Sequence, residues 1–293
     1  MKRTKLENLA QVIIILLMSL LMLTIVVPIM HIVSVSISTK EAVNAGLVGL
    51  FPSGFDLGVY KELLGQNLFQ TSMKNTLFLT ATVTVLGLSV NFMAAYAFSK
   101  KFYGKKIINY IFIFTMYFSG GLIPSYILVT NWLHLRNNYL ALILPILVNV
   151  FYIIVIRTQI EAVPASLSEA AEMDGATEFQ IMTRVVLPTV GPTIAAIGMF
   201  IALDAWNMWY SVLLYTDDRS FWTLQYFLRV VIFEKSVAFN PDGLAAIAQG
   251  TEQLNPLNFQ MAAIVIVALP VVAIYPFVQK YFVKGILAGS VKE

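Results

Sequence analysis

The stretch EAAEMDGATEFQIMTRVVLP, residues 169–188, is a charged segment in a strongly apolar chain. It contains four carboxylates and one arginine. The whole chain of 293 residues is 58% hydrophobic and only 12% charged, with a mean hydropathy of +0.78. This composition is typical of an integral membrane protein rather than of a soluble domain. The stretch is therefore expected to be a loop between membrane-spanning helices.

Six apolar stretches are long enough to cross a bilayer, which needs about 20 residues per helix. The predicted spans are 10–33, 75–98, 107–130, 139–156, 190–215 and 259–282. No polar segment between them is long enough to form a soluble domain of its own. The sequence predicts an all-α integral membrane protein with six transmembrane helices, in a single domain over residues 1–293.

The basic residues predict the orientation of the chain. Six spans place both termini on one side, and twelve of the nineteen Lys and Arg residues fall on that side. A cluster in the loop after the second span contributes Lys100, Lys101, Lys105 and Lys106. Because cytoplasmic loops carry an excess of Lys and Arg, we expect cytoplasmic termini and a cytoplasmic loop over residues 157–188.

Several functional classes lack the residues that they need. There is no cysteine, no phosphate-binding G-x-x-x-x-G-K-[ST] motif and no H-E-x-x-H motif, and the net charge of +3 includes no basic block suited to nucleic acid. The two histidines, His31 and His134, lie in or beside different predicted helices. We therefore assign no catalytic residue and no metal site, and we do not expect an enzyme or a nucleic-acid-binding protein.

The loop 157–188 is predicted to contain two short helices joined by a glycine turn. Ser166 and Glu169 have the S-x-x-E spacing of a capping box, and Thr177 and Gln180 have the equivalent spacing for the second helix. Gly175 between them suits the left-handed residue that follows many helices. The second helix is expected to end at about Val186, because Leu187 is followed by a proline.

The spacing of this loop resembles the cytoplasmic motif of bacterial ABC importer permeases. In that motif E-A-A is followed by three residues, a glycine, nine residues and then I-x-L-P, and this chain departs only by Val185 in place of isoleucine. The resemblance implies the type I ABC importer permease fold and a coupling helix that sits in a cleft of a cytoplasmic ATPase, with Glu169 facing a basic residue there. The residues implied in ATPase coupling are Glu169, Ala170, Ala171, Glu172, Asp174, Gly175, Leu187 and Pro188.

The resemblance covers nearly the whole chain. The segments FSGGLIPSYILV (118–129), LALILPILVN (140–149), AWNMWYSVLLY (205–215) and LQYFLR (224–229) are similar to the second permease subunit of maltose-type carbohydrate importers. Within that group they are most similar to the subset that handles larger or acidic oligosaccharides, and an alginate-type importer is one candidate. The resemblance implies a bacterial plasma (inner) membrane protein surrounded by lipid.

The same resemblance implies the partners of the chain. They are a second homologous permease subunit, two cytoplasmic ATPase subunits, an extracytoplasmic solute-binding protein and an oligosaccharide substrate. No cofactor is expected in this chain, because ATP and Mg would be bound by the ATPase. A stand-alone secondary transporter or channel is the alternative, which explains the spans but gives the loop 157–188 no role.

Polar side chains within the apolar spans are candidates for a translocation pathway, because they are costly in lipid unless they face a cavity or a partner. On a continuous fifth span, Asp204, Asn207 and Ser211 would share one helical face. Aromatic rings beside hydrogen-bonding groups suit a sugar. The predicted pathway residues are Asp204, Trp206, Asn207, Trp209, Tyr210 and Ser211. The alternative is an interfacial aromatic belt with Asp204 in a structural hydrogen bond.

Three further features are weaker signals. Four residues are weaker pathway candidates for which interhelical hydrogen bonds are the favoured alternative, namely Asn91, Asn131, Asn149 and Tyr152. The glycines and proline at 120, 121 and 124 interrupt the third span, either as a discontinuous helix at a transport site or as a packing kink. The last outside loop, about 216–258, is implied by the resemblance to contact the binding protein, with a turn formed by Asn240, Pro241, Asp242 and Gly243.

Overall fold

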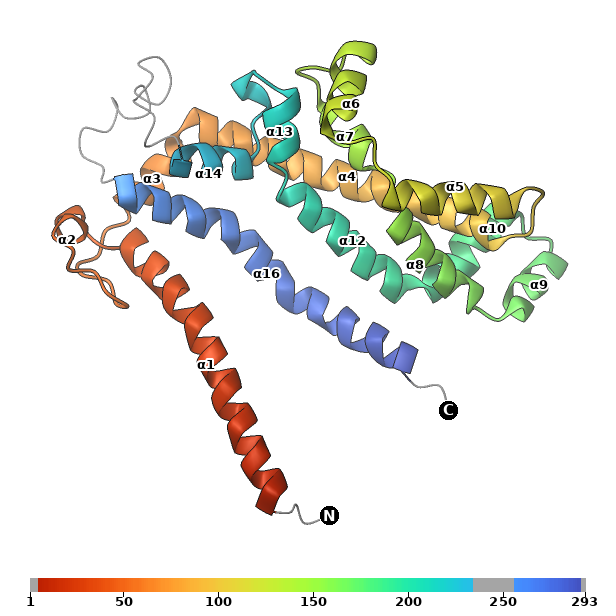
Figure 1. Ribbon diagram of the computed structural model, residues 1–293, viewed down its shortest axis with the longest axis horizontal. Coiled ribbons are helices and arrows are strands. Elements are labelled where there is room, and N and C mark those ends of the chain that lie inside the picture. Colours follow the sequence, from red (N-terminus) through yellow and green to blue (C-terminus); the bar gives the residue numbers. More distant parts are fainter. Residues whose placement is uncertain (1–4, 234–255, 291–293) are drawn as a thin grey trace. The chain divides into compact units, whose positions relative to one another are not determined.

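The computed structural model describes residues 5–233 and 256–290, which are helical apart from turns and short connections (Figure 1). The chain divides into two compact units. One comprises Met1–Phe69 and Leu228–Leu269, and the other comprises Gln70–Phe227 and Pro270–Glu293. The predicted turn at Asn240, Pro241, Asp242 and Gly243 lies outside the described residues.

The first unit is built around the long helix α1 (Lys5–Ser36) and the short helices α2 (Lys40–Asn44) and α3 (Gly58–Gly65). The segment between α2 and α3 runs back along the end of α1, where His31 Nδ1 lies 2.9 Å from the carbonyl oxygen of Gly49 and the Ser34 hydroxyl donates to the Leu50 carbonyl. The start of α16 (Pro256–Ser290) joins this unit. There the buried amide of Asn258 donates to the carbonyls of Val35 and Ser38.

The second unit contains most of the helices and the candidate sites. Its elements, in chain order, are α4 (Asn67–Ser99), α5 (Lys105–Tyr117), α6 (Leu122–Ile127), the π-helix η1 (Leu128–Trp132), α7 (Tyr139–Ile143), the 3₁₀-helix η2 (Leu144–Ile146), α8 (Val150–Glu161), α9 (Ala165–Met173), α10 (Glu178–Gln180), the π-helix η3 (Ile181–Val186), α11 (Leu187–Thr189), α12 (Gly191–Trp206), α13 (Tyr210–Tyr215), η4 (Arg219–Phe221) and α14 (Leu224–Phe233). The first residues of α4 and the last of α14 belong to the first unit.

Among the described residues, three helices are long and apolar enough to span a membrane unbroken, namely α1, α4 and α16. The count rises to six if each of three bent helix pairs is one span. The pair formed by α5 with α6 and η1 is bent by 107°, the pair formed by α7 and η2 with α8 by 48°, and the pair formed by the helix 178–189 with α12 by 85°. Each of the six predicted stretches overlaps one of these helices or bent pairs, and three of them overlap a bent pair.

One of the breaks was predicted and another was not. The predicted interruption of the third span is confirmed at 118–121, a segment that ends with Gly121, whose φ of +85° favours glycine. The prediction of one continuous helix over 190–215 is wrong, because α12 ends at Trp206 and α13 starts at Tyr210. The buried core between these elements includes Leu79, Val83, Leu142, Ile156, Ile201 and Val212.

Candidate coupling surface and translocation cavity

The helix α9 begins directly after Pro164 and is not capped by Ser166. Pro164 takes the N-cap position with φ −56° and ψ 128°, and no side chain caps the helix. Ser166 is the second residue inside the helix, so the first predicted capping box is wrong. The proline ring fixes φ close to the helical value, which starts the helix without a polar cap.

The glycine turn after α9 is confirmed. Gly175 has φ +81°, and its N–H donates to the carbonyl of Glu172 at 3.0 Å. The N–H of Ala176 donates to the carbonyl of Ala171, also at 3.0 Å. These two bonds form a Schellman motif, which satisfies the last carbonyls of the helix and reverses the chain.

The second capping box is also confirmed, and the helix that it starts is longer than predicted. The N–H of Gln180 donates to Thr177 Oγ1, and the N–H of Thr177 donates to Gln180 Oε1 at 2.8 Å. The helix continues through the π-turns of η3 and past Pro188 to Thr189. The expected break at Leu187 and Pro188 is therefore wrong. The chain bends only at Val190, just before Gly191 and Pro192 begin α12.

We call α9 the projecting helix, because none of its described side chains is fully buried. Glu169, Ala170, Glu172 and Asp174 are exposed, whereas Ala171 is half-buried and packs against the core. The two alanines therefore have different roles. Ala170 leaves a flat outer surface, and the small side chain of Ala171 allows α9 to pack closely on η3.

Large apolar side chains are exposed on α9 and just beyond its glycine turn, and they were not identified from the sequence. Met173 is 88% exposed, Phe179 67% and Leu167 46%. The signal was present in the sequence, because Leu167, Ala170 and Met173 recur every three residues along one side of a short helix. Exposed apolar groups rimmed by carboxylates are typical of a protein-docking surface.

We call residues 177–186 the anchored segment, because it is fixed to the membrane helices. Its side chains Ile181, Met182 and Val186 are buried. The hydroxyl of Tyr96 donates to Glu178 Oε2, and Lys100 Nζ lies 3.1 Å from the same carboxylate. The hydrogen bond from Tyr96, with the charge of Lys100, lowers the pKa of Glu178 below its ordinary value against the opposing effect of partial burial. The carboxylate of Glu178 is thus paired with residues of its own chain.

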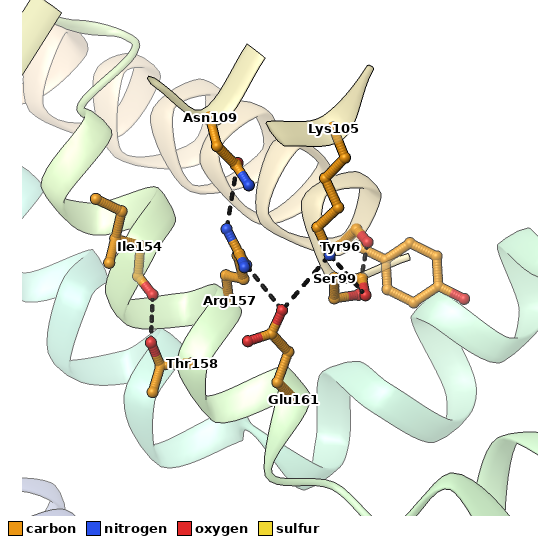
Figure 2. A network of polar contacts seen from close by, with 8 residues as sticks. All are labelled: Tyr96, Ser99, Lys105, Asn109, Ile154, Arg157, Thr158 and Glu161. Atoms are coloured by element: carbon orange, nitrogen blue, oxygen red, sulfur yellow. Dashed lines mark hydrogen bonds and ion pairs between the residues drawn. The ribbon is translucent and has the colours of Figure 1, made fainter. Parts of the chain in front are cut away.

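A second polar network joins the ends of α4, α5 and α8 beside this loop, as Figure 2 shows. Arg157 Nε donates to Glu161 Oε1 at 2.8 Å, and another guanidinium nitrogen of Arg157 donates to Asn109 Oδ1 at 3.2 Å. Lys105 Nζ lies 3.8 Å from Glu161 and donates to the carbonyl of Ser99. The base from which α9 projects is therefore cross-linked by charged hydrogen bonds.

A cavity of about 350 Å³ lies where two of the helix breaks meet. It is lined by Val83 of α4, by residues of the break 147–149, by α8 and α12, and by the break 207–209. Its polar lining residues are Asn149, Tyr152, Asp204, Asn207, Tyr210 and Ser211. Non-helical backbone at membrane depth is tolerated where it is buried in protein or lines a polar cavity.

Buried side chains hold the backbone at both breaks. The amide of Asn91, which is fully buried, donates to the carbonyl of Leu147 at 2.8 Å and accepts from the N–H of Asn149 at 2.9 Å. The hydroxyl of Thr223 donates to the carbonyl of Met208. The interhelical role expected of Asn91 is therefore confirmed. Asn149 has two roles, because it also caps α8 and lines the cavity.

Five of the six predicted pathway residues line this cavity, but not for the predicted reason. Asp204, Asn207 and Ser211 do not share one helical face, since α12 ends between the first two of them. The break itself brings them together. Trp206 is 6% exposed and is not among the lining residues. Tyr152, a weaker pathway candidate for which an interhelical bond was favoured, makes that bond by donating to Asp204 Oδ2 at 3.0 Å and also lines the cavity.

Bent membrane-spanning pairs, a polar cavity at helix breaks and a helix–turn–helix segment between two spans define a membrane permease. The chain belongs to the family of binding-protein-dependent transport system inner membrane components, whose family model matches residues 85–288. Its fold is the type I importer permease fold, and its location is the inner membrane.

Relatives and a solved structure agree with this assignment. The chain is 34% identical to the polygalacturonan/rhamnogalacturonan transport system permease protein YtcP of Bacillus subtilis over 91% of this chain and 92% of the relative. It is 37% identical to the protein LplC of Bacillus subtilis over 91% and 89% of the two chains. A chain of a bacterial ABC transporter involved in the import of the acidic polysaccharide alginate matches with a TM-score of 0.88 and 32% identity, over 96% of this chain and 99% of that one.

Proposed function

We propose that this chain is one of two permease subunits of an ATP-driven importer that takes up carbohydrate oligomers delivered by a solute-binding protein. The names of the relative YtcP and of the alginate importer support carbohydrate as the cargo, and both name polymers that contain acidic sugars. The alginate-type prediction from the sequence has the same support. The chain itself is a permease and not an enzyme.

The projecting helix is the observation that carries this proposal. Glu169, Glu172 and Asp174 are exposed around apolar Met173, on a helix whose base is tied to α4, α5 and α8. A stand-alone transporter has no use for such a surface. We assign it to docking on a cytoplasmic ATPase, with Glu169 facing a basic residue. Because the sequence has no phosphate-binding loop, ATP and Mg would be bound by that partner.

The anchored segment provides a route by which movement at the docking surface would be transmitted to the membrane helices. The helix from residue 178 to Thr189 is continuous with the bend that starts α12, and α12 carries Asp204 at the cavity. Movement of the ATPase against α9 would be passed through this helix to α12. Rigid elements with a bend between them are a physical route for such coupling. Leu187 and Pro188 lie on this route, between the docking surface and the bend.

The cavity is the proposed pathway, with Asp204, Asn207, Trp209, Tyr210 and Ser211 contributed by this chain. The second permease subunit would close it from the other side. Trp206 then has a packing role beside the pathway. The loop that contains Asn240, Pro241, Asp242 and Gly243 is proposed to contact the solute-binding protein.

The proposal is tested with a complex purified through a tag on this chain and reconstituted into liposomes. We expect an ATPase and a second permease to copurify, and we expect uptake of a carbohydrate oligomer to require ATP and the binding protein. The charge reversal Glu169→Arg is expected to lower stimulated ATP hydrolysis and uptake together by tenfold or more. Glu41→Arg, the same charge reversal at an exposed glutamate on α2, is the matched control and is expected to leave both activities unchanged.

Two results would overturn the proposal. Uptake by the chain alone, driven by an ion gradient without ATP, would make it a secondary transporter. A fully assembled Glu169→Arg complex with normal stimulation would remove the coupling role from the projecting helix.

A further inference from the structure

The cavity at the helix breaks combines aromatic, amide and hydroxyl groups with one carboxylate. Trp209 and Tyr210 pack edge to face with ring centroids 5.4 Å apart, and both line the cavity. Asp204 is its only charged lining residue, and no Lys, Arg or His is among the lining residues that the structure describes. The described residues of this chain thus contribute a negative charge and no compensating positive group, an arrangement that discriminates between charged and uncharged ligands.

The hydrogen-bonding state of Asp204 leaves it ready to accept from a ligand. Oδ2 accepts from the Tyr152 hydroxyl at 3.0 Å, which orients the carboxylate. A carboxylate can accept at about four lone-pair positions, and among the described residues the Tyr152 hydroxyl is the one donor to the Asp204 side chain. The groups that best satisfy the remaining positions are hydroxyl donors, which every sugar ring carries.

The neighbouring amide supplies the complementary donors. Asn207 Oδ1 accepts from Gln225 Nε2 at 2.9 Å, so the two N–H donors of Asn207 are directed elsewhere. A sugar hydroxyl donates once and accepts as well, and it can therefore bond to Asp204 and Asn207 together. A uronate carboxylate has no proton to donate to Asp204. It also brings a second negative charge into a site of low dielectric constant.

The electrostatic cost of that second charge is large enough to decide selectivity. Two like charges about 6 Å apart repel strongly at the effective dielectric constant of a partly buried site, enough to change an equilibrium constant on the order of 100-fold. Neutral amide and hydroxyl dipoles recover part of this cost. After this partial offset, we expect the site to prefer an uncharged ring over a uronate ring by about tenfold or more.

We infer that this cavity is a subsite for an uncharged sugar ring, with Asp204 as the residue that disfavours uronate rings at this point of the pathway. The inference rests on the proposed function and adds a substrate class to it. An acidic cargo is compatible with it when uncharged rings alternate with or flank the charged ones. An oligomer made only of uronates, such as an alginate oligomer, is disfavoured at this subsite, so the inference favours a cargo with mixed rings over the alginate-type cargo.

The test compares an oligogalacturonide with its carboxyl-reduced form, in which a neutral CH2OH group replaces each carboxylate, in the reconstituted complex. For each cargo we take the uptake rate of Asp204→Asn divided by that of the wild type, so that selection by the binding protein cancels. We expect this ratio to be about tenfold or more higher for the oligogalacturonide. The control Asp217→Asn, at an exposed aspartate paired with Arg136 outside the cavity, is expected to give equal ratios for the two cargoes.

A second measurement needs no binding protein. Quenching of Trp209 fluorescence, taken as the difference between the complex and its Trp209→Phe variant, reports occupancy of the cavity by each oligomer. We expect the carboxyl-reduced oligomer to quench at a concentration about tenfold lower, and Asp204→Asn to remove the difference. Equal quenching by both oligomers, unchanged in Asp204→Asn, would overturn the inference while leaving the proposed function intact. Failure of any carbohydrate to stimulate the complex would instead overturn the proposed function.

Discussion

The two halves of the loop between α8 and α12 have opposite relations to the rest of the protein. The projecting helix, α9, buries none of its described residues and shows Glu169 and Met173 to solvent. The anchored segment buries Ile181, Met182 and Val186 and binds α4 through Glu178. The projecting helix ends at residue 173 and the anchored segment begins at residue 177, only four positions later. One half is available to a partner, and the other is fixed to the membrane helices.

This difference separates docking from transmission. Changes on the projecting helix should affect the partner without affecting the stability of the chain, because the side chains are exposed. Changes in the anchored segment should loosen the chain itself. The turn at Gly175 joins the two halves, so changes there should affect both the partner and the stability of the chain. The predictions below test this separation, beginning with the largest expected effect.

The largest effect is expected from Met173→Asp on the projecting helix. Met173 is 88% exposed, so the substitution removes an apolar docking contact and adds a desolvation cost at the interface without disturbing the core. Stimulated ATP hydrolysis by the assembled complex should fall by about tenfold or more, which corresponds to roughly 1.4 kcal/mol. Thermal unfolding of the isolated chain should be unchanged.

Tyr103→Asp is the control for this change. Tyr103 is an exposed residue in the short loop between α4 and α5, outside both halves of the segment. It should leave ATP hydrolysis unchanged. A Met173→Asp complex that hydrolyses ATP normally would show that docking uses another surface.

Gly175→Ala is expected to have the next largest effect. The space around Gly175 is open, so the cost is only the strain of a left-handed alanine at φ +81°, about 1–2 kcal/mol. Faster amide exchange at Ala176 would measure the loss of the Schellman bonds. Asn is tolerated in this conformation, so Gly175→Asn should recover part of the protection.

A glycine without positive φ provides the comparison. Gly65 ends α3 and also has open space around it, so Gly65→Ala carries no such strain. Equal effects of the two substitutions would mean that the backbone conformation at 175 is not what stabilises the turn.

The features that the sequence predicted well are those set by neighbours in the chain. The glycine turn at 175 and the capping box of Thr177 with Gln180 depend on residues three to five positions apart, and both formed. The box at Ser166 failed for an equally local reason, the proline at 164, which already starts the helix. Local spacing therefore predicted the order helix, glycine turn and helix in this loop, but not how the first helix starts or where the second one ends.

The cavity was predicted only in part, because distant residues determine it. The break at 207–209 contains no glycine or proline, and its backbone is held by Thr223, fifteen residues from Met208. The break at 147–149 depends on Asn91, and Asp204 is oriented by Tyr152, 52 residues away. Polarity in an apolar span identified the residues, but only tertiary contacts show how they meet.

Within the anchored segment, Thr177→Ala is expected to destabilise the start of α10 by about 1 kcal/mol. The substitution removes the hydroxyl that accepts from the N–H of Gln180 and leaves that donor unpaired. Amide exchange at residues 178–180 should accelerate about fivefold. Thr177→Ser keeps the hydroxyl and should exchange as the wild type does. If both variants exchange alike, the cap is not what holds this end of the helix.

The smallest effect is expected from the ion pair that fastens the anchored segment to α4. Tyr96 and Lys100 lower the pKa of Glu178 in the folded chain below the ordinary value of 4.5. A lowered folded-state pKa adds stability that is present above pH 4.5 and is lost as the pH falls through the lower value. Because the carboxylate is largely exposed, the contribution should stay below about 1 kcal/mol and shrink with salt. Protection of residues 178–180, measured relative to amides in α8, should therefore fall in the wild type as the pH drops below 4.5. Glu178→Gln should begin at the lower protection and show no such pH dependence. The same decline in both proteins would mean that another group fastens this half of the loop.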